Sequence, residues 1–398
     1  MFSLSPSSFV FKEIMCQTII MLMKKVHPVL INLKLNKLVS LKRSLSSLHD
    51  AGVYELSSDK PCFTLSDLRQ RIPRHLFKKN TQISLSYFLR DVVSITTSSC
   101  IALYFDSWYI WPVYWFLQGS FFWALFNIGH DCVHHSFSNN QCVNDVVGLI
   151  SDSFLLVPFH GFRASHRIHH TFHAHPEKDE SWKPLPRGCS GLLNTIGTVF
   201  RTKLPFSLLS FPVYLWFPVS HFDPRSKFFA FTDKRLVMIS NVCIFMFLCV
   251  LYQAMTVLGV CAVMNLYFAP YVIFCAWLSG VSYLHHHGSV DGEPLIPWYR
   301  GSEWSYLRGS LSSVDRDYGV FNELHHNIGT HVVHHIFPEI PHYNLVEATK
   351  HIKEILGSYY RIPVKCQGWF PFHLIKPLVH SFDNDHTVPS TGDVVYYE

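Results

Sequence analysis

Residues 109–135 read Y-I-W-P-V-Y-W-F-L-Q-G-S-F-F-W-A-L-F-N-I-G-H-D-C-V-H-H and join an apolar run directly to a histidine cluster. The apolar part, 109–129, has no charged residue and is long enough to cross a bilayer, which takes a helix of about 20 residues. His130 follows without an intervening loop. We therefore expect the cluster to lie where a transmembrane helix leaves the membrane.

Two further clusters repeat this pattern, H-R-I-H-H at 166–170 and H-V-V-H-H at 331–335. Residues three or four positions apart share a helix face, whereas an adjacent residue lies about 100° further round the helix. His130 and His134 can therefore point at one metal ion, whereas the adjacent histidine pairs of the second and third clusters can serve two neighbouring ions. Imidazole suits iron, zinc, copper and nickel, and eight or nine imidazoles are too many for one ion. The pattern predicts two ions held by nitrogen, unlike the carboxylate-bridged di-iron bundles with their E-x-x-H motifs.

The composition is typical of a membrane protein. Charged residues make up 15% of the 398 residues, against about 25% in soluble domains, and the mean hydropathy is +0.16. The net charge of +5 with neutral histidines is compatible with anionic lipid head groups, and there is no basic stripe typical of nucleic-acid binding. The 11 cysteines lack C-x2-C pairs, so no disulfide framework is indicated.

Two long apolar stretches free of Lys and Arg, 91–129 and 236–284, predict an all-α, polytopic membrane protein with about four transmembrane helices in two hairpins. We expect these spans near 88–105, 109–129, 236–256 and 261–284. Two spans separate the second cluster from the third, so all three clusters lie on one side of the membrane. The excess of Lys and Arg beside the spans places that side in the cytosol or its equivalent. A cytosolic helical cap would then hold the metal site.

The segments outside the spans are assigned as follows. Residues 1–59 form a basic, Ser-rich leader, which is either a targeting peptide or a disordered segment that touches the membrane. Residues 60–398 form one domain, whose part 285–398 is soluble in character. The apolar stretch 146–159 is interrupted by Asp152 and Pro158, which predicts a surface or re-entrant helix.

From about residue 60 to 398 the chain resembles the membrane fatty acid desaturases, most closely the methyl-end, omega-3 (Δ15) branch of plant, algal and cyanobacterial type. The resemblance rests on G-H-D-C-V-H-H-S-F-S, V-P-F-H-G-F-R-A-S-H-R-I-H-H, Y-L-H-H-H-G and H-H-N-I-G-T-H-V-V-H-H-I-F-P-E-I-P-H-Y-N-L-V-E-A-T. The run P-W-Y-R-G-S-E-W-S-Y-L-R-G and the tail D-V-V-Y-Y-E resemble omega-3 more than Δ12 members.

The resemblance implies a di-iron centre whose ligands are three histidine boxes and one histidine after the fourth span. In this sequence these are His130, His134, His166, His169, His170, His286, His331, His334 and His335. Additional ligands, or residues that orient the ligands, are sought among His135, His173, His285, His325, His326 and Asp131. The usual first box reads H-D-C-G-H-G, and here Val133 and His135 replace its two glycines without removing a ligand.

Other side chains are expected to support this centre. Carboxylates often orient metal-bound imidazoles, and Asp131, Asp179, Glu180, Asp315 and Asp317 are candidates. His175 is expected outside the ligand shell, and His342 at the turn after the third cluster. Aromatic residues expected either to line an acyl tunnel or to anchor the membrane interface are Trp182, Tyr283 and Trp304.

The family chemistry removes two hydrogens from unactivated methylenes, which no acid or base side chain can do, so a cofactor must carry the step. The resemblance implies two iron ions, O2 as co-substrate and electrons from cytochrome b5 or ferredoxin, since the chain has no flavin or haem signature. The substrate would be an acyl-lipid (phospholipid or galactolipid) or an acyl-CoA in the bilayer, with a linoleoyl chain converted to linolenoyl. We expect the endoplasmic reticulum rather than a plastid.

Several alternatives stay open. A Δ12 (oleoyl) desaturase, a fatty acyl hydroxylase or an acetylenase would share the scaffold. A non-enzymatic metal-handling membrane protein should place His or Asp near mid-membrane, and 236–284 has none there. A zinc hydrolase would bind one zinc ion rather than two irons.

Overall fold

The computed structural model describes residues 58–181, 183–184, 198–226, 229, 233–287, 296–384 and 386–397. Almost all of the predicted leader, and Trp182, lie outside these residues. The all-α class expected from the sequence is confirmed for the described part, where the strands are a single two-residue pair. β1 (Trp298–Tyr299) pairs antiparallel with β2 (Val394–Val395), so that Trp298 lies opposite Val395.

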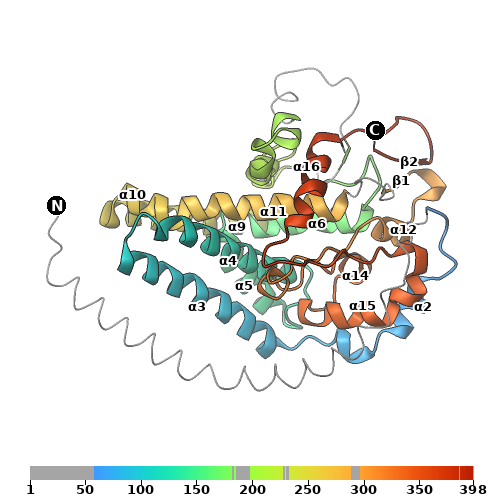
Figure 1. The fold of residues 1–398 in the computed structure, drawn as a ribbon, viewed down its shortest axis with the longest axis horizontal. Coiled ribbons are helices and arrows are strands. Elements are labelled where there is room, and N and C mark those ends of the chain that lie inside the picture. Colours follow the sequence, from blue (N-terminus) through green and yellow to red (C-terminus); the bar gives the residue numbers. More distant parts are fainter. Residues whose placement is uncertain are drawn as a thin grey trace.

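Long helices run side by side along the longest axis of the molecule (Figure 1). Helix α4 (Ile110–Val133) packs against both α3 (Thr81–Phe105) and α11 (Ala269–His286). Helix α9 (Asp233–Leu258) is followed by the short α10 (Val260–Val263), and the π-helical turn η3 (Met264–Phe268) joins α10 to α11. Helix α3 begins seven residues before the predicted span, because the Asn80 side chain accepts hydrogen bonds from the backbone N–H groups of Gln82 and Ile83 and caps the helix there.

Three helices are long and apolar enough to cross a membrane, Thr81–Phe105, Lys234–Leu258 and Val260–His286. Helix α4, the fourth predicted span, is not among them, although it has 24 residues. Nearly all of its second half is buried, and its Gln118 exchanges hydrogen bonds with Ser98 and Ser99 of α3. A helix surrounded by protein needs less hydropathy than one facing lipid. The number of spans and their orientation stay predictions.

Two helices follow α4 and bend sharply at the predicted interruption. Helices α5 (Gln141–Phe154) and α6 (Phe159–Phe172) are bent by 102° relative to one another. Together they are long and apolar enough to form a broken membrane span or a re-entrant loop. Both pack against α9. The bend directs α6, with the second histidine cluster, towards the end of α4.

Short helices form a cap at one end of the long helices (Figure 1). They are α2 (Leu65–Arg71), η1 (Arg74–Phe77), η4 (Gly301–Glu303), α12 (Tyr306–Leu311), α14 (His331–Ile336), α15 (His342–Leu356) and η5 (Gly357–Tyr359), whereas α13 (Phe321–Leu324) packs against α4. The cap has its own apolar core, which includes Leu68, Val333 and Ile352. Against α11 pack η2 (Phe206–Leu209), α8 (Ser210–Tyr214) and, after η6 (Phe372–Leu374), α16 (Ile375–Asn384).

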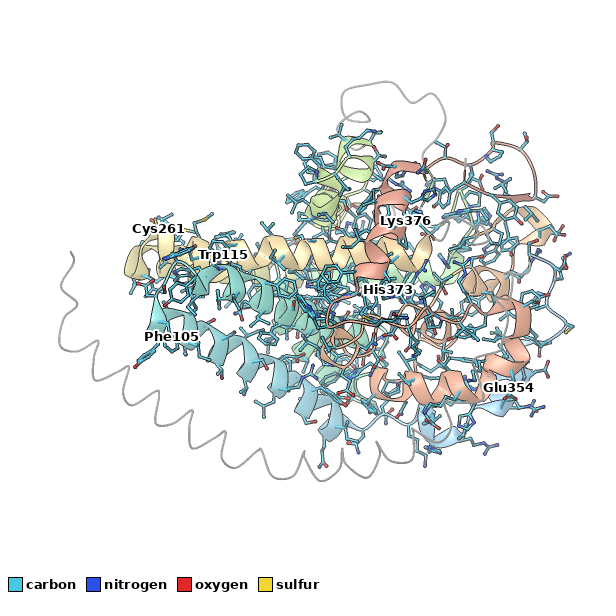
Figure 2. All side chains as sticks on the ribbon, viewed as in Figure 1. Phe105, Trp115, Cys261, Glu354, His373 and Lys376 are labelled. Atoms are coloured by element: carbon cyan, nitrogen blue, oxygen red, sulfur yellow. The ribbon has the colours of Figure 1, made fainter. Side chains whose placement is uncertain are left out.

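The two ends of the molecule differ in polarity (Figure 2). Phe105, Trp115 and Cys261 lie at the end formed by the long helices, whereas Glu354 lies at the cap. Exposed apolar side chains follow the outer helices, with Phe245 and Tyr252 of α9 exposed by 66% and 70%. This distribution suits helices surrounded by lipid and a cap that faces water.

Candidate metal centre

The ends of four helices bring the three clusters together. His130 lies in the last turn of α4 and His134 is its C-cap, while α6 carries the second cluster and α14 the third. His286 is the last residue of α11. All nine histidines expected as ligands lie in the described part of the chain, and only His134 and His166 are partly exposed.

Five of the nine imidazoles form a first group. Their nitrogens all lie within 4.8 Å of one another, and the group consists of His130, His134, His166, His170 and His334. Nε2 of His166 lies 2.8 Å from Nε2 of His130 and 3.0 Å from Nε2 of His134. These rings come from α4, α6 and α14 and converge on one point.

The other four imidazoles form a second group beside the first. Ligand nitrogens of His169, His286 and His335 lie within 4.8 Å of one another. Nε2 of His331 lies 3.2 Å from Nε2 of His286 and 3.1 Å from Nε2 of His335. The ring of His170, in the first group, stacks on the ring of His335, in the second, with the centroids 4.2 Å apart. The two groups are therefore directly adjacent.

The donor set fits two metal ions. Both ring nitrogens of His170 and Nε2 of His334 are buried and make no hydrogen bond within the described part of the chain, although buried polar atoms are normally paired. Burial and the surrounding imidazoles lower the pKa of His334 and of His335 well below the ordinary value. Both rings are therefore neutral, which is the form that binds metal. A pair of transition-metal ions would satisfy these nitrogens.

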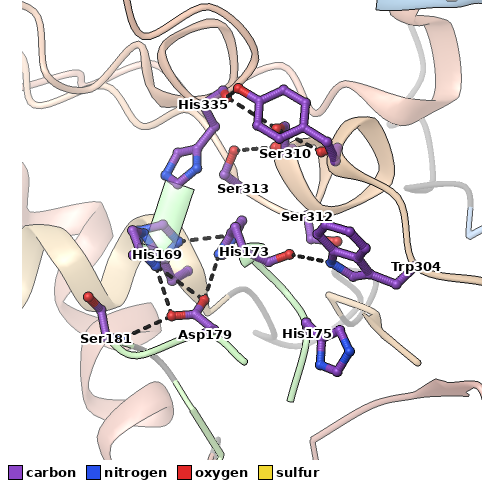
Figure 3. Close-up of polar contacts among 12 residues, drawn as sticks. His169, His173, His175, Asp179, Ser181, Trp304, Ser310, Ser312, Ser313 and His335 are labelled. Atoms are coloured by element: carbon purple, nitrogen blue, oxygen red, sulfur yellow. Dashed lines mark hydrogen bonds and ion pairs between the residues drawn. The ribbon is translucent and has the colours of Figure 1, made fainter. Parts of the chain in front are cut away.

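Asp179 holds two of the imidazoles in place (Figure 3). Nδ1 of His169 donates to Oδ1 of Asp179 at 3.0 Å, and Nδ1 of His173 donates to Oδ2 at 3.2 Å. Burial alone would raise the pKa of Asp179, but the charges and hydrogen bonds of the two histidines lower it overall. A carboxylate on Nδ1 leaves Nε2 available to a metal and fixes the orientation of the ring.

Two other candidate carboxylates act on backbone or on a non-ligand ring. Asp315 accepts hydrogen bonds from the backbone N–H groups of His331 and Val332, at 2.7 and 2.8 Å, and so holds the start of α14. Oδ2 of Asp131 lies 2.7 Å from Nδ1 of His342, the first residue of α15. Neither carboxylate contacts a ring of the two groups through these bonds.

Three other candidate histidines, His285, His173 and His135, are not among the nine imidazoles of the two groups. Nδ1 of His285 lies 2.6 Å from the Val314 carbonyl and its Nε2 lies 3.1 Å from the Tyr318 hydroxyl, while its ring stacks on His331. Nε2 of His173 lies 3.4 Å from Nδ1 of His286. His285 and His173 therefore contact His331 and His286 from outside the second group. The side chain of His135 belongs to neither group.

His325 and His326 lie apart from the two groups. His325 packs among aromatic rings, stacked on Phe321 and edge-on to Trp277. Nε2 of His326 lies 2.6 Å from Oδ2 of Asp91, which joins the turn after α13 to α3. Positive φ angles at His326 and Asn327 turn the chain between α13 and α14, and this turn separates both histidines from the third cluster.

The aromatic candidates that are described have structural contacts. Trp304 donates from Nε1 to the His173 carbonyl at 3.1 Å (Figure 3). The Tyr283 hydroxyl donates to the Arg201 carbonyl at 2.6 Å, and its ring stacks on His287. Sequence reasoning did not single out Tyr306, whose hydroxyl donates to the His335 carbonyl at 2.7 Å. No local pattern marks this contact, because it joins residues 29 positions apart.

Comparison with known proteins agrees with this geometry. The fatty acid desaturase family model matches residues 106–365, and a second model, described as a domain of unknown function, matches residues 42–99.

A chloroplastic omega-3 fatty acid desaturase of Glycine max is 50% identical over 343 residues, which are 85% of this chain and 75% of the relative. The acyl-lipid omega-3 desaturase (cytochrome b5) of the endoplasmic reticulum of Arabidopsis thaliana is 48% identical over 346 residues, 86% of this chain and 89% of the relative. A temperature-sensitive sn-2 acyl-lipid omega-3 desaturase (ferredoxin) from the chloroplast of the same plant is 49% identical over 343 residues, 85% of this chain and 78% of the relative. With most of its length matched, the chain belongs to the fatty acid desaturase family.

Proposed function

We propose that this protein is an omega-3 fatty acid desaturase, an oxidoreductase that uses O2 to introduce a cis double bond at the methyl end of an unsaturated acyl chain. Its reaction would convert a linoleoyl chain to a linolenoyl chain. The observation that carries the proposal is the convergence of nine imidazoles into two adjacent groups at the ends of apolar helices. The relatives named above support the omega-3 position of the new double bond.

Two iron ions would be held by the two groups of imidazoles. When bound, they would supply the oxidising power, with O2 and two external electrons, that removes hydrogen from an unactivated methylene. The first ion would bind His130, His134, His166, His170 and His334, and the second would bind His169, His286, His331 and His335.

The protein's own residues supply rigid positioning and exclude water. Asp179 fixes the ring of His169, and Asp315 fixes the helix that carries the third cluster. Buried side chains pack around the last turns of α4, with Phe137 and Phe159 both fully buried. Excluding water protects a strongly oxidising centre from side reactions.

The proposal extends to the electron donor, the cellular compartment and the substrate. We propose cytochrome b5 as the donor and the endoplasmic reticulum as the site, with an acyl-lipid as the substrate. The relatives include a cytochrome b5 form and a ferredoxin form. The Lys and Arg that flank the predicted spans place the clusters on the cytosolic or equivalent side of the membrane, where an electron donor can reach them.

Expression in a yeast that lacks this activity tests the function. Cells would be fed oleate and linoleate separately, and their fatty acids would be analysed. New α-linolenate from linoleate is expected, and new linoleate from oleate would instead make the protein a Δ12 desaturase. A hydroxylated product would indicate a hydroxylase. No modified fatty acid from a membrane-inserted chain with two irons, supplied with cytochrome b5, would contradict the proposal.

A matched pair of histidine variants ties the activity to the centre. His334→Ala removes a buried ring of the first group and should abolish the product. His351→Ala removes an exposed ring of α15 outside both groups and should keep it. Metal analysis of the purified chain should give two irons, whereas a single zinc would indicate a hydrolase. Iron without any acyl product would favour a metal-handling protein.

A further inference from the structure

Exposed apolar side chains mark the segment 362–375, which lies outside the predicted spans. The segment leads from η5 through η6 to the first residue of α16. Its exposed apolar residues are Ile362, Val364, Trp369, Phe372 and Ile375. Trp369 and Phe372 are exposed by 68% and 59%, nearly as much as the outer side chains of α9, and their ring centroids lie 6.0 Å apart. Adjacent exposed apolar rings of this kind mark a site of contact with another molecule or with a membrane.

Phe370, which lies between these two residues in the chain, packs on two of the long helices. Its ring centroid lies 6.3 Å from that of Trp277 in α11 and 6.2 Å from that of Phe116 in α4. Trp277 comes nine residues before His286, so it lies about 13 Å along the helix from the metal centre. Phe116 comes 14 residues before His130, which is about 21 Å along α4. The segment therefore lies beside the long helices, away from the cap.

The length of the neighbouring helix gives the depth of Phe370 relative to a bilayer. Val260–His286 is a candidate membrane span of 27 residues, whereas a helix crosses the hydrocarbon core in about 20 residues. Every window of that length within the span contains Trp277. Wherever the span sits in the membrane, Trp277 and the ring of Phe370 beside it are therefore at the depth of the hydrocarbon core. The exposed rings of Trp369 and Phe372 adjoin Phe370 in the chain and lie near the same depth.

Helix α16 returns the chain towards the metal-centre end of α11. It packs against α11 and runs across its direction (Figure 1). A Cβ on Gly280 would lie 3.5 Å from a methyl group of Leu378, and the rings of Phe382 and Tyr283 lie with their centroids 4.3 Å apart. Successive residues of α16 thus meet positions successively closer to the end of α11 at His286. The chain enters and leaves this depth on the same side.

Asp317 fastens the start of the segment to the turn before α13. The backbone N–H of Cys366 donates to Oδ2 of Asp317 at 3.3 Å, and Nζ of Lys365 pairs with the same oxygen at 3.5 Å. Oδ1 of Asp317 accepts from the backbone N–H of Gly319 at 2.9 Å. Gly319 has a φ of 63°, and a Cβ there would lie 2.8 Å from Sγ of Cys366. Asp317, expected from the sequence to support the metal centre, thus holds this segment in place through these contacts.

We propose that the segment 362–375 enters the membrane leaflet nearer the metal centre and that Trp369 and Phe372 contact lipid there. Tryptophan is enriched where the hydrocarbon core meets the headgroups. Irregular backbone at this depth is tolerated where it packs on protein, as Phe370 does on α4 and α11. The inference goes beyond the proposed reaction and does not depend on it. It places within the membrane a part of 285–398, the stretch that is soluble in character by its sequence.

Photocrosslinking tests which molecule covers the segment. The full-length, iron-loaded protein is placed in vesicles of dioleoyl phosphatidylcholine, and the photoreactive residue benzoylphenylalanine replaces Trp369 or Phe372. Phe245, exposed on α9, is the reference for lipid contact, and Val346, exposed on α15 of the cap, is the reference for water. We expect covalent adducts with phosphatidylcholine at the two test positions and at Phe245, and none at Val346. Adducts with protein instead of lipid at the test positions, or lipid adducts at Phe245 alone, overturn the proposal.

Tryptophan fluorescence gives a second measurement in the same vesicles. Trp369→Phe keeps an aromatic ring, so the fold and the iron content should be unchanged, and the emission that it removes belongs to Trp369. That emission should be quenched by lipids with bromine on their acyl chains and hardly by aqueous iodide. Trp298→Phe is the matched control, because Trp298 is buried in β1, and its emission should be quenched by neither. Quenching of the Trp369 emission by iodide and not by the brominated lipid overturns the proposal.

Discussion

Oδ1 of Asp179 lies 3.0 Å from Nδ1 of His169, and both side chains are almost fully buried. The contact joins the loop after α6 to a ring of the second group. It also determines which nitrogen of His169 faces the other imidazoles, because Nδ1 is engaged by the carboxylate.

Asp179→Asn should therefore reduce iron binding at the second group. The amide cannot accept from two imidazoles as a carboxylate does, and loss of such a partner typically costs about 10- to 100-fold in metal affinity or activity. Metal analysis after dialysis against a weak chelator measures the effect. Asp223→Asn, which removes an exposed carboxylate paired with Arg225, is the control. Equal iron retention in the two variants would show that Asp179 does not support the centre.

Tyr397 supports the other side of the second group. Its ring stacks on His287 with the centroids 5.0 Å apart, and His287 directly follows His286. Tyr397→Ala should loosen the end of α11 and reduce iron content and activity, whereas Tyr397→Phe keeps the ring and should preserve both. A Phe variant as impaired as the Ala variant would mean that the hydroxyl, not the stacking, matters.

Gly161 allows α6 to pack close to the backbone of a neighbouring segment. A Cβ at this position would lie 2.2 Å from the carbonyl oxygen of His221. Gly161→Ala should force α6 to move and destabilise the protein by about 1–3 kcal/mol, as overpacking does, and disturb the second cluster. Gly280→Ala is the matched control, since its Cβ would meet only the two Leu378 methyl groups, at 3.5 and 3.9 Å. Thermal unfolding in detergent compares the two, and equal melting temperatures would contradict the packing argument.

Iron removal should lower the stability of the whole cap. Nine imidazoles from four helices converge on the two groups, and a ligand that binds only the folded state stabilises it by about 4 kcal/mol at a thousandfold excess over its dissociation constant. Chelation should lower the melting temperature, and added Fe²⁺ should restore it. His334→Ala should show a smaller shift on chelation. A melting temperature unaffected by chelation in the parent protein would argue against metal bridging between the clusters.

The sequence alone determined the local geometry of the metal centre. Residues four apart on a helix share a face, and His130 with His134, and His166 with His170, do lie in one group. Adjacent residues differ by about 100°, and His169 and His170 lie in different groups, as do His334 and His335. The helical class, the apolar runs and the interruption near Pro158 are equally local properties.

Only the tertiary structure decided which distant residues meet. Asp131 binds His342, 211 positions away, rather than a ring of either group, whereas Asp179 binds His169. His325 and His326 lie next to each other in the sequence and contact an aromatic cluster and Asp91 instead of the centre. The left-handed backbone of His135 was also invisible in the sequence. Such features depend on how helices pack against one another, and the spacing of residues along one helix carries no information about the helix opposite.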